Sequence, residues 1–407
     1  MKTEVALSGR LPLGKRVLFS LFVAAIITGL VAAAGELCLR WSIPAPPFSA
    51  SLNLHTHLRI TCESNLHGVS SPIRHTTNKW GMRGSDPPPE GRAWDETTTI
   101  VTVGGSTTQC FYLDDTRTWA YIMEQKLLSG GHNVWVGNVG QDGHSTRGNV
   151  LVIDKVVSAI RPDYVLFLVG VNDLALSLDG TWKTGNPFDG NMTELALGPA
   201  RSAALNRLLD HSRLAHQLYQ LKRSYLDGIT IRAVRYQSSI PTEPLTELEA
   251  PLPAKVDDML PSLPLFRSNV LRLIRTARAI GVTPVFLTQP LLFEDNERWR
   301  GIRARMFWIG KEHQLLSGAT YARLLDRFNH ELLAICAEND VACFDLAREI
   351  PHSDDFFYDM VHFNDAGAQL VGAKVATFLT EHLLVTSRSY RNAKPQTVPP
   401  KQLSFGG

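Results

Sequence analysis

The chain has little of what marks several protein classes. It carries only five cysteines among 407 residues, and none of them forms the Cys-x-x-Cys pair typical of metal sites. Its charges almost cancel, leaving a net +2 at pH 7, and no Lys/Arg-rich run stands out. Nothing electrostatic therefore indicates nucleic acid as a partner. No internal repeat is present, and we expect neither a metal ion nor a cofactor. What remains is an ordinary globular composition, 44% hydrophobic and 20% charged.

The few cysteines leave one pairing to consider. They are Cys38, Cys62, Cys110, Cys336 and Cys343. An exported domain is able to oxidise one pair, and Cys336 with Cys343, at a helix-to-strand junction, is the first choice for it. The alternative is that all five are small buried hydrophobic residues.

A long uncharged run lies close to the amino terminus. Val17 to Ala34 contains no charged residue, and as a helix it is ~27 Å long, close to the ~30 Å of a bilayer core. Four cations and one acid precede the run: Lys2, Arg10, Lys15 and Arg16, with Glu4. The two charged residues that follow it, Glu36 and Arg40, cancel. This asymmetry favours a cytoplasmic amino terminus.

We therefore expect a single-pass membrane protein. Residues 1–16 are cytoplasmic, 17–39 form an uncleaved transmembrane signal anchor, and the domain that follows is periplasmic or extracellular. Two alternatives stay open. Ala32-Ala33-Ala34 before Gly35 also resembles a signal-peptidase site, although the run is longer than the ~7–15 residues of a signal h-region. The run is also compatible with a buried core helix.

Beyond the apolar run the composition changes twice. Residues 40–97 are rich in Pro, His and Ser, which predicts a stalk and an irregular first segment. From residue 98 strands and helices alternate up to residue 385, and 386–407 read as a flexible tail. The predicted strands are Thr98–Val103, Asn133–Asn138, Tyr164–Val169, Thr283–Thr288 and Val341–Leu346. This alternation predicts an α/β fold, a three-layer α/β/α sandwich around a parallel, flavodoxin-like five-stranded sheet.

Two stretches interrupt the alternation. Residues 174–264 are too long for a connection and form an insertion. Its Pro199–Leu226 part has a helical pattern with a break near Ser212. After the break one face carries Leu214, Leu218, Leu221 and Tyr225. Packing on the domain is the expectation for this face, and an anionic membrane surface is the alternative.

The second interruption, Phe293 to Ala319, is expected to rim the site. It interleaves aromatic residues with arginines: Trp299, Phe307 and Trp308 with Arg298, Arg300, Arg303 and Arg305. This mixture suits sugar faces better than alkyl chains. The alternative is that its tryptophans only pack the segment onto the domain.

Polar residues with a possible chemical role follow the predicted strands. Ser106 stands after Gly104-Gly105, where the first strand meets a tight turn. Gly143 lies in a glycine-containing loop after the second strand. Asn172, after the third, has an amide that can donate hydrogen bonds. After the fifth come Asp359 and His362, with Asn364-Asp365 as a natural helix cap. Each residue alone also has an ordinary structural role in a turn or cap.

In this order the motifs resemble those of the SGNH (GDSL-like) hydrolase superfamily, over residues 98–380. The resemblance is carried by Gly104–Thr108, by Gly143, by the Gly170–Asp173 block and by the Asp-x-x-His of 359–362. It implies that Ser106 is the nucleophile, His362 the base and Asp359 the acid that orients it. It also implies an oxyanion hole made by the backbone N–H groups of Ser106 and Gly143 and the Asn172 amide. The chain departs from the Gly-Asp-Ser form in having Gly105 before the serine.

The sequence therefore predicts an exported serine esterase with a Ser-His-Asp triad. Its substrate is an acyl ester, with acetyl groups on an envelope glycan as the specific expectation, and its only other partner is the membrane around the amino-terminal helix. Two alternatives stay open. The same site also permits an envelope O-acyltransferase, and a non-catalytic glycan-binding or scaffold protein would have the same fold.

Overall fold

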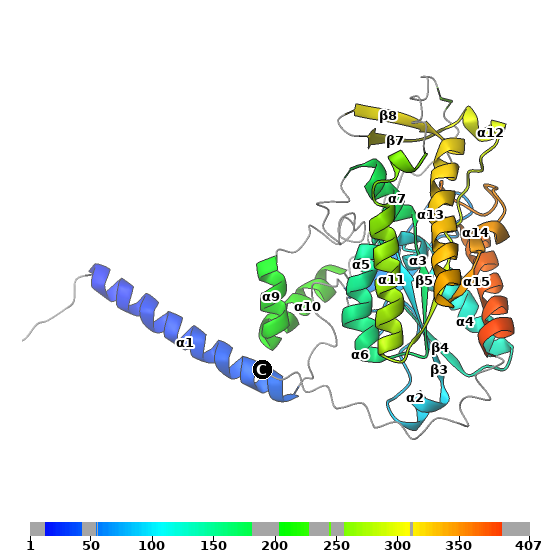
Figure 1. The fold of residues 1–407 in the computed structure, drawn as a ribbon. Helices are drawn as coiled ribbons and strands as arrows, with labels where there is room; N and C mark the ends of the chain where they lie inside the picture. The colour runs from blue at the N-terminus through cyan, green and yellow to red at the C-terminus, as the bar shows by residue number, and fades with distance from the viewer. Residues whose placement is uncertain are drawn as a thin grey trace, which may run out of the picture. The chain divides into compact units, whose positions relative to one another are not determined.

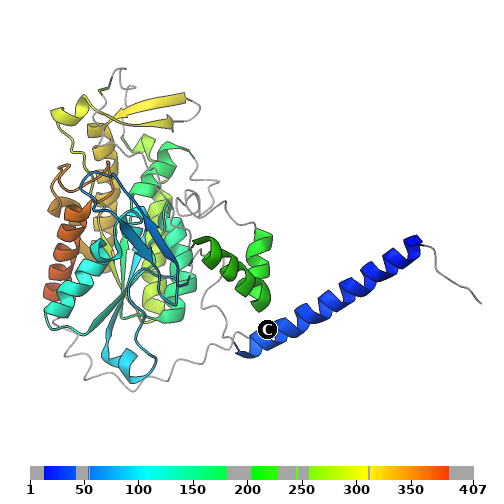
Figure 2. The same cartoon turned by 180° about the vertical axis from the view of Figure 1, so that it is seen from behind.

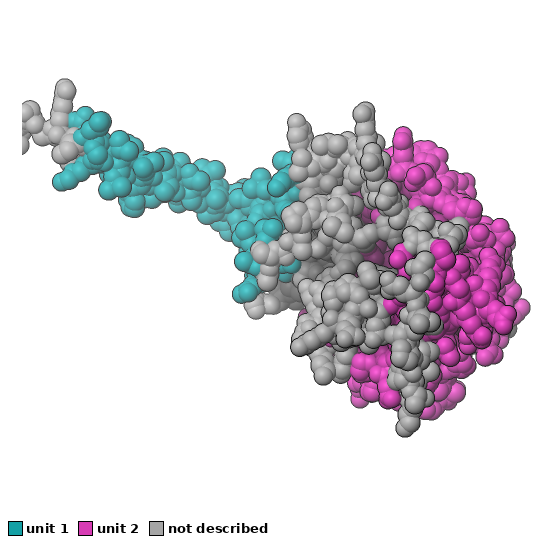
Figure 3. Space-filling view, turned by 90° about the horizontal axis from the view of Figure 1, so that it is seen from above, with its two compact units in different colours: residues 1–53, 201–226 teal, residues 54–200, 227–407 magenta. Residues whose placement is uncertain are grey.

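The computed structural model describes residues 13–42, 54, 56–180, 203–227, 244–245, 256–309 and 312–384. Three predicted segments lie wholly or partly outside the described residues: the tail at 386–407, most of the cytoplasmic segment and the beginning of the stalk. So do the middle of the insertion and its expected helix start at Pro199. Two compact units are present: residues 54–200 with 227–407, and residues 1–53 with 201–226 (Figure 3).

A parallel sheet of five strands forms the centre of the larger unit (Figure 1). Its strands are β3 (Thr98–Gly104), β4 (Val134–Asn138), β5 (Tyr164–Leu168), β6 (Thr283–Leu287) and β9 (Ala342–Phe344). They lie in the order β4-β3-β5-β6-β9, and every neighbouring pair is parallel. Ile100 of β3 pairs with Val136 on one side and Tyr164 on the other. This is the flavodoxin-like order, so the predicted fold class is confirmed.

Helices cover both faces of the sheet, which gives the three layers (Figures 1 and 2). On one face α4 (Trp119–Ser129) packs on α15 (Asp365–Leu379). Gly372 permits this close packing, because a Cβ there would lie 2.7 Å from the Trp119 carbonyl oxygen. On the other face lie α5 (Thr146–Val152), α11 (Leu263–Ala279) and α13 (Gly318–Asn339). Phe266 of α11 meets Phe328 of α13 edge to face at 5.1 Å.

Further short helical segments lie between and beside these elements. They are α2 (Arg92–Glu96), α3 (Ser106–Gln109), η2 (Asp115–Arg117), η3 (Ile153–Val157), α6 (Ser158–Ile160), α7 (Val171–Leu178), η5 (Val256–Met259), α12 (Glu297–Arg300), α14 (Leu346–Glu349) and η6 (Thr380–Leu384). Because α7 ends at Leu178, the first residues of the expected insertion continue the helix that comes after β5.

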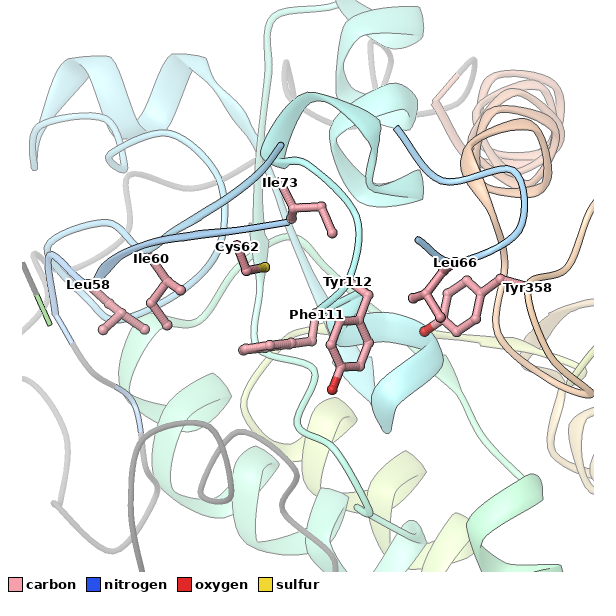
Figure 4. Packing of buried hydrophobic residues seen from close by; sticks show 8 residues of the cluster. All are labelled: Leu58, Ile60, Cys62, Leu66, Ile73, Phe111, Tyr112 and Tyr358. Atoms are coloured by element: carbon pink, nitrogen blue, oxygen red, sulfur yellow. The ribbon is translucent and has the colours of Figure 1, made fainter. Parts of the chain in front are cut away.

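The segment before residue 98 contains an antiparallel hairpin, β1 (Arg59–Cys62) and β2 (Ile73–Thr76). Its apolar side chains belong to a buried cluster that also holds Phe111, Tyr112 and Tyr358 (Figure 4). The aromatic residues come from the loop after α3 and from the loop before α15. The folded unit therefore takes in part of the stretch that the sequence suggests is a stalk and an irregular first segment.

The described part of the insertion contains two helices, α9 (Ala203–His211) and α10 (Arg213–Asp227). They meet at Ser212, so the predicted break is confirmed. Leu218 and Leu221 on α10 are 57% and 66% exposed. Within the smaller unit neither α1 nor α9 covers these two side chains. The expectation that this face packs on the domain stays a prediction.

The second excursion forms another hairpin, β7 (Arg303–Ile309) with β8 (Glu312–Ser317). Trp299 in α12, just before it, is 4% exposed and meets Phe293 edge to face at 5.1 Å. This ring packs the excursion onto the domain. The side chains of Phe307 and Trp308 lie outside the described residues.

A disulfide joins Cys336, near the end of α13, to Cys343 in β9. Their Cα atoms are 6.0 Å apart, within the usual range for such a bond. The expected pairing is confirmed. It ties the last crossover helix to the edge strand of the sheet.

One long helix precedes the folded units. It is α1 (Leu13–Ser42), with a mean hydropathy of 2.5 over its most apolar window and none of that window buried. It extends beyond the uncharged run at both ends, because Lys, Arg and Glu are good helix formers. By length and composition α1 is able to cross a membrane, and an amino-terminal signal sequence has the same properties.

Candidate active site

Ser106 is the first residue of α3, directly beyond the end of β3. The chain turns there through Gly104 and Gly105, and both lack space for a side chain. A Cβ at Gly104 would lie 2.6 Å from the Leu168 carbonyl oxygen. A Cβ at Gly105 would collide with the amide nitrogen of Asn172. Gly105 thus lets the Asn172 amide lie against the backbone next to the serine.

Hydrogen bonds hold the serine turn in place from three directions. The Thr107 hydroxyl donates to Gln289 Oε1 at 3.1 Å, beyond the end of β6. The Trp119 indole N–H donates to the Thr107 carbonyl oxygen at 3.0 Å. The guanidinium of Arg83, itself 5% exposed, donates to the carbonyl oxygens of the next turn: those of Gln109, Cys110 and Leu113. The turn that carries Ser106 is therefore a fixed part of the domain.

The loop before α15 brings His362 to the serine. His362 Nε2 lies 2.8 Å from Ser106 Oγ, and His362 Nδ1 lies 2.6 Å from Asp359 Oδ2. The other Asp359 oxygen accepts the backbone N–H groups of Val361 and His362, at 2.8 and 2.7 Å. Asn364 caps α15 by accepting the Gly367 N–H at 2.9 Å, as its position predicts. The structure thus places Ser106, His362 and Asp359 in one hydrogen-bonded chain.

Two opposing effects set the pKa of His362. Burial disfavours the protonated ring, but the Asp359 carboxylate, its hydrogen bond to the ring, and the charge of Asp142 favour it. The net result is a pKa above the ordinary value. The pKa of Asp359 lies below its usual value: burial opposes ionisation, and the charge and hydrogen bonds of His362 outweigh it. This carboxylate is therefore ionised at neutral pH.

We expect esterase activity to rise with pH through a midpoint above about 6.5, the ordinary histidine value. Only a neutral imidazole accepts the Ser106 proton, and the raised pKa of His362 moves its deprotonation to higher pH. The measurement is kcat/KM for an activated ester against pH. In Asp142→Asn the midpoint should fall, because a negative charge that favours imidazolium is removed. A rate that is flat from acid to neutral pH would contradict this role for His362.

Two further predicted residues lie around the serine turn. Asn172 is the second residue of α7, and its Nδ2 donates to the His144 carbonyl oxygen at 2.9 Å. An amide nitrogen carries two hydrogens, so one donor position remains for a ligand. Gly143 lies beside His144 with a φ of 75°, in the left-handed region that favours glycine. The N–H of the nearby Gln141 donates to the Gly104 carbonyl oxygen at 3.0 Å, which ties this loop to the end of β3.

Replacing Asn172 with Ala should lower kcat by about 10²–10³ with little change in KM, because an oxyanion donor acts mainly when charge develops. Steady-state kinetics on an activated ester measure both constants. Asn269→Ala is the matched control, because the Asn269 amide donates within the fold, to Thr146 Oγ1 at 3.1 Å. A raised KM with unchanged kcat would instead make Asn172 a substrate-binding or turn residue.

Sequence reasoning missed several side chains around the site. Tyr358 stacks on the His362 ring, with centroids 5.4 Å apart and planes within 5°. Asp142 acts on His362 through its charge. Asp173 is buried and accepts the Thr146 N–H and hydroxyl, which joins α7 to α5. Burial raises its pKa to about 6. Only Asp173 had a signal in the sequence, as part of the Gly170–Asp173 block.

The sequence model of the GDSL-like lipase/acylhydrolase family matches residues 102–370. This span contains all five predicted site residues and most of the sheet. The chain belongs to the GDSL-like lipase/acylhydrolase family. Its β1–β2 hairpin lies before the matched span, so the buried cluster around Tyr358 joins the family region to a preceding segment.

Solved structures with a similar fold include three that are 11–13% identical to this GDSL-like chain. A putative lipolytic protein of the G-D-S-L family from Desulfitobacterium hafniense is 12% identical, over 70% of this chain and 100% of its own, with a TM-score of 0.38. An acetylxylan esterase from Geobacillus stearothermophilus is 13% identical, over 70% and 93%, with a TM-score of 0.39. A psychrotrophic esterase from Pseudoalteromonas is 11% identical, over 70% and 98%, with a TM-score of 0.38. No curated protein matched the chain.

Proposed function

We propose that this protein is an extracytoplasmic serine esterase that hydrolyses short acyl esters, acetyl esters above all. The observation that carries the proposal is the hydrogen-bonded chain from Ser106 Oγ through both nitrogens of His362 to Asp359. Family membership supports the reaction class, since lipases and acylhydrolases cleave ester bonds. Nucleophilic acyl transfer requires a serine, a base within hydrogen-bond reach of it and a carboxylate that orients the base.

The first half of the reaction forms an acyl-enzyme. With a proton on Nδ1 shared with Asp359, the free Nε2 of His362 accepts the Ser106 proton while Oγ attacks the ester carbonyl carbon. The tetrahedral oxyanion is bound by the backbone N–H groups of Ser106 and Gly143 and by the Asn172 amide. The C–O bond of the leaving group then breaks, and the alkoxide takes the proton from His362.

The second half returns the serine. Water gives a proton to His362 Nε2 as its oxygen attacks the acyl carbon. When the second tetrahedral intermediate collapses, the bond from the acyl carbon to Ser106 Oγ breaks, His362 returns the proton to Oγ, and the carboxylic acid is released. If an acceptor hydroxyl replaces the water, the same steps give O-acyl transfer. We propose hydrolysis. Acyl transfer would be detected by adding an acceptor alcohol to the panel of esters.

The proposed short acyl group rests on the groups described around His362 and the serine. Asp142, Asn172 and Tyr358 offer a charge, an amide and a phenol ring. A long alkyl chain needs a continuous apolar lining. The idea that Trp299 binds a glycan has no support, because this ring is buried against Phe293. We propose a glycan as the carrier of the acetyl group only because the domain is expected to lie outside the membrane, where envelope glycans are found.

The proposed location rests on α1. Four cations precede its apolar run, which favours a cytoplasmic amino terminus and export of the chain beyond α1. The disulfide between Cys336 and Cys343 is consistent with export, because such bonds persist in oxidising compartments. In this proposal α1 stays attached as a membrane anchor.

A panel of p-nitrophenyl esters on the full chain in detergent tests the proposal. We expect kcat/KM to fall by about tenfold or more from acetyl to octanoyl, because the described groups around Ser106 and His362 are polar and a long alkyl chain needs a continuous apolar lining. A value that rises with chain length would overturn the short-acyl proposal. Absence of turnover together with no labelling of Ser106 by a fluorophosphonate would favour the non-catalytic alternative. Acyl transfer to added oligosaccharide at the expense of hydrolysis would identify a transferase.

A further inference from the structure

The carboxyl end of α1 is hydrogen-bonded to the corner between α9 and α10, and all three helices belong to the smaller unit. Glu36 accepts the backbone N–H groups of Arg213 at 2.9 Å and Leu214 at 2.8 Å. It also accepts the Ser212 hydroxyl at 2.8 Å. One carboxylate therefore caps the amino terminus of α10, where negative charge is favoured.

Arg40 completes the contact one turn further along α1. Its Nη2 donates to the His211 carbonyl oxygen at the end of α9, at 2.6 Å, and its Nε donates to Glu36 at 2.7 Å. A cation thus lies at the carboxyl end of one helix and an anion at the amino end of the next, and both charges come from α1. This arrangement fixes the helix corner to one place on α1.

That place is where α1 leaves the proposed membrane. The uncharged run ends at Ala34, and Glu36 is the first charged residue after it. Ionised side chains are strongly disfavoured within hydrocarbon, so Glu36 and Arg40 belong at the boundary with water. A helix corner bonded to both side chains lies at the same depth. This step rests on the proposed spanning of the membrane by α1.

The helix pair has the surface that such a position requires. Leu208 on α9 and Leu218 and Leu221 on α10 are 54%, 57% and 66% exposed. Leu214, on the same face of α10, lies against α1: a Cβ at Gly35 would be 3.9 Å from its methyl groups. The apolar face of α10 is therefore continuous with the lipid-facing surface of α1.

Cations accompany these leucines. Exposed Arg207 and Lys222 lie next to Leu208 and Leu221 in the sequence. Long basic side chains beside a leucine face are typical of helices that lie in a membrane interface, where the apolar groups enter the acyl region and the cations reach the phosphates.

We propose that α9 and α10 form an interfacial element that lies on the outer leaflet of the membrane that α1 crosses. Glu36 and Arg40 hold the element at the point where α1 emerges. The occupant of the leucine face is the bilayer, with anionic headgroups near Arg207 and Lys222. The element would thus keep the smaller unit flat against the membrane, which a single spanning helix alone does not do.

The test measures depth in the membrane with the full chain in nanodiscs. Cys38 is exposed and is replaced by Ser, while Cys62 and Cys110 are buried. A single reporter cysteine with a fluorophore is then placed at Leu218. Quenching by nitroxides at the headgroup end of the lipid tails is compared with quenching by a water-soluble agent. Two reference positions are labelled in the same way: Ala25 in α1, and exposed Lys126 in α4.

We expect lipid-borne quenching at Leu218 to exceed that at Lys126 severalfold and to increase when anionic lipid is added. Quenching at Ala25 by nitroxides deep in the bilayer reports the spanning of α1 independently. A Leu218 reporter that behaves like Lys126, or that is shielded from both kinds of quencher, overturns the interfacial proposal even when Ala25 is in the bilayer. An unquenched Ala25 overturns the proposed membrane anchor instead.

A second variant tests the hydrogen-bonded contact itself. Glu36→Ala removes the carboxylate that caps α10, so lipid-borne quenching at Leu218 should fall severalfold while quenching at Ala25 stays unchanged. Glu381→Ala, in η6, is the matched control and should change neither value. If Leu218 keeps its depth without Glu36, this contact does not hold the element, and the proposal is wrong in that step.

Discussion

Replacing Ser106 with Ala should lower kcat for ester hydrolysis by about 10⁴–10⁶. In the proposed mechanism Ser106 Oγ forms the covalent intermediate, and this oxygen lies 2.8 Å from His362 Nε2. The fold should not change, because the backbone bond of the turn, from the Cys110 N–H to the Ser106 carbonyl oxygen at 2.8 Å, does not use the hydroxyl. Release of p-nitrophenol from the acetate ester measures the rate, and thermal unfolding checks the fold.

Ser158→Ala is the matched control for this variant. The Ser158 hydroxyl donates to the Ile153 carbonyl oxygen at 2.8 Å, within its own helical segment. Loss of that bond should leave kcat within about twofold, since Ser158 is half-buried in a helical segment and none of its described hydrogen bonds reaches the site. Hydrolysis by Ser106→Ala at the rate of the unchanged protein would remove Ser106 from the nucleophile role. Loss of activity in both variants would point to damage of the fold.

Local sequence patterns were sufficient to predict the framework of the domain. The strand Thr98–Gly104 is a run of β-branched residues ended by glycine, which is a strong signal for a buried parallel strand. Ser212 and Asn364 mark helix boundaries, because short polar side chains cap helices better than they continue them. The approach of Ser106 to His362 agrees with the motif order, since the carboxyl ends of parallel strands meet at one edge.

Contacts between segments that are far apart in the sequence could not be predicted in this way. Arg83 donates to a carbonyl oxygen 30 residues further on, and Tyr358 packs with residues of the β1–β2 hairpin. Neither residue stands in a periodic pattern, and a lone arginine between Met82 and Gly84 gives no sign of burial. What covers Leu218 and Leu221 is not predictable for a related reason: amphipathic periodicity shows that a face is apolar but not what covers it.

The hairpin before the family region also bears on how His362 is held. Leu66 and Tyr358 share the buried cluster shown in Figure 4, and Tyr358 stacks on the His362 ring. The Asp365 N–H donates to the Gly68 carbonyl oxygen at 3.1 Å, and Asp365 Oδ2 accepts the Ser70 N–H at 3.0 Å. The histidine loop is therefore packed from outside by a segment that the family match does not include, and removing that segment would leave the loop without this support.

Replacing Asp359 with Asn should lower kcat by about 10³–10⁴. Asn retains an oxygen for the N–H groups of Val361 and His362, so the loop keeps its shape. Its NH2 group, however, donates to His362 Nδ1 where the carboxylate accepted. The ring proton then moves to Nε2, and the atom that faces Ser106 can no longer accept a proton. Steady-state hydrolysis of an acetate ester over a range of pH measures the effect.

The pH profile separates this role from a merely structural one. Without the Asp359 charge the pKa of His362 should fall, because the carboxylate is a principal cause of its raised value. The residual activity should therefore reach its plateau at lower pH than in the unchanged protein. Asp355→Asn, an exposed acid in the same loop whose Oδ2 accepts the Ser353 hydroxyl at 2.9 Å, is the matched control and should alter neither rate nor midpoint. A large loss of rate with an unshifted midpoint would mean that Asp359 only supports the loop, and that another group sets the protonation of the histidine.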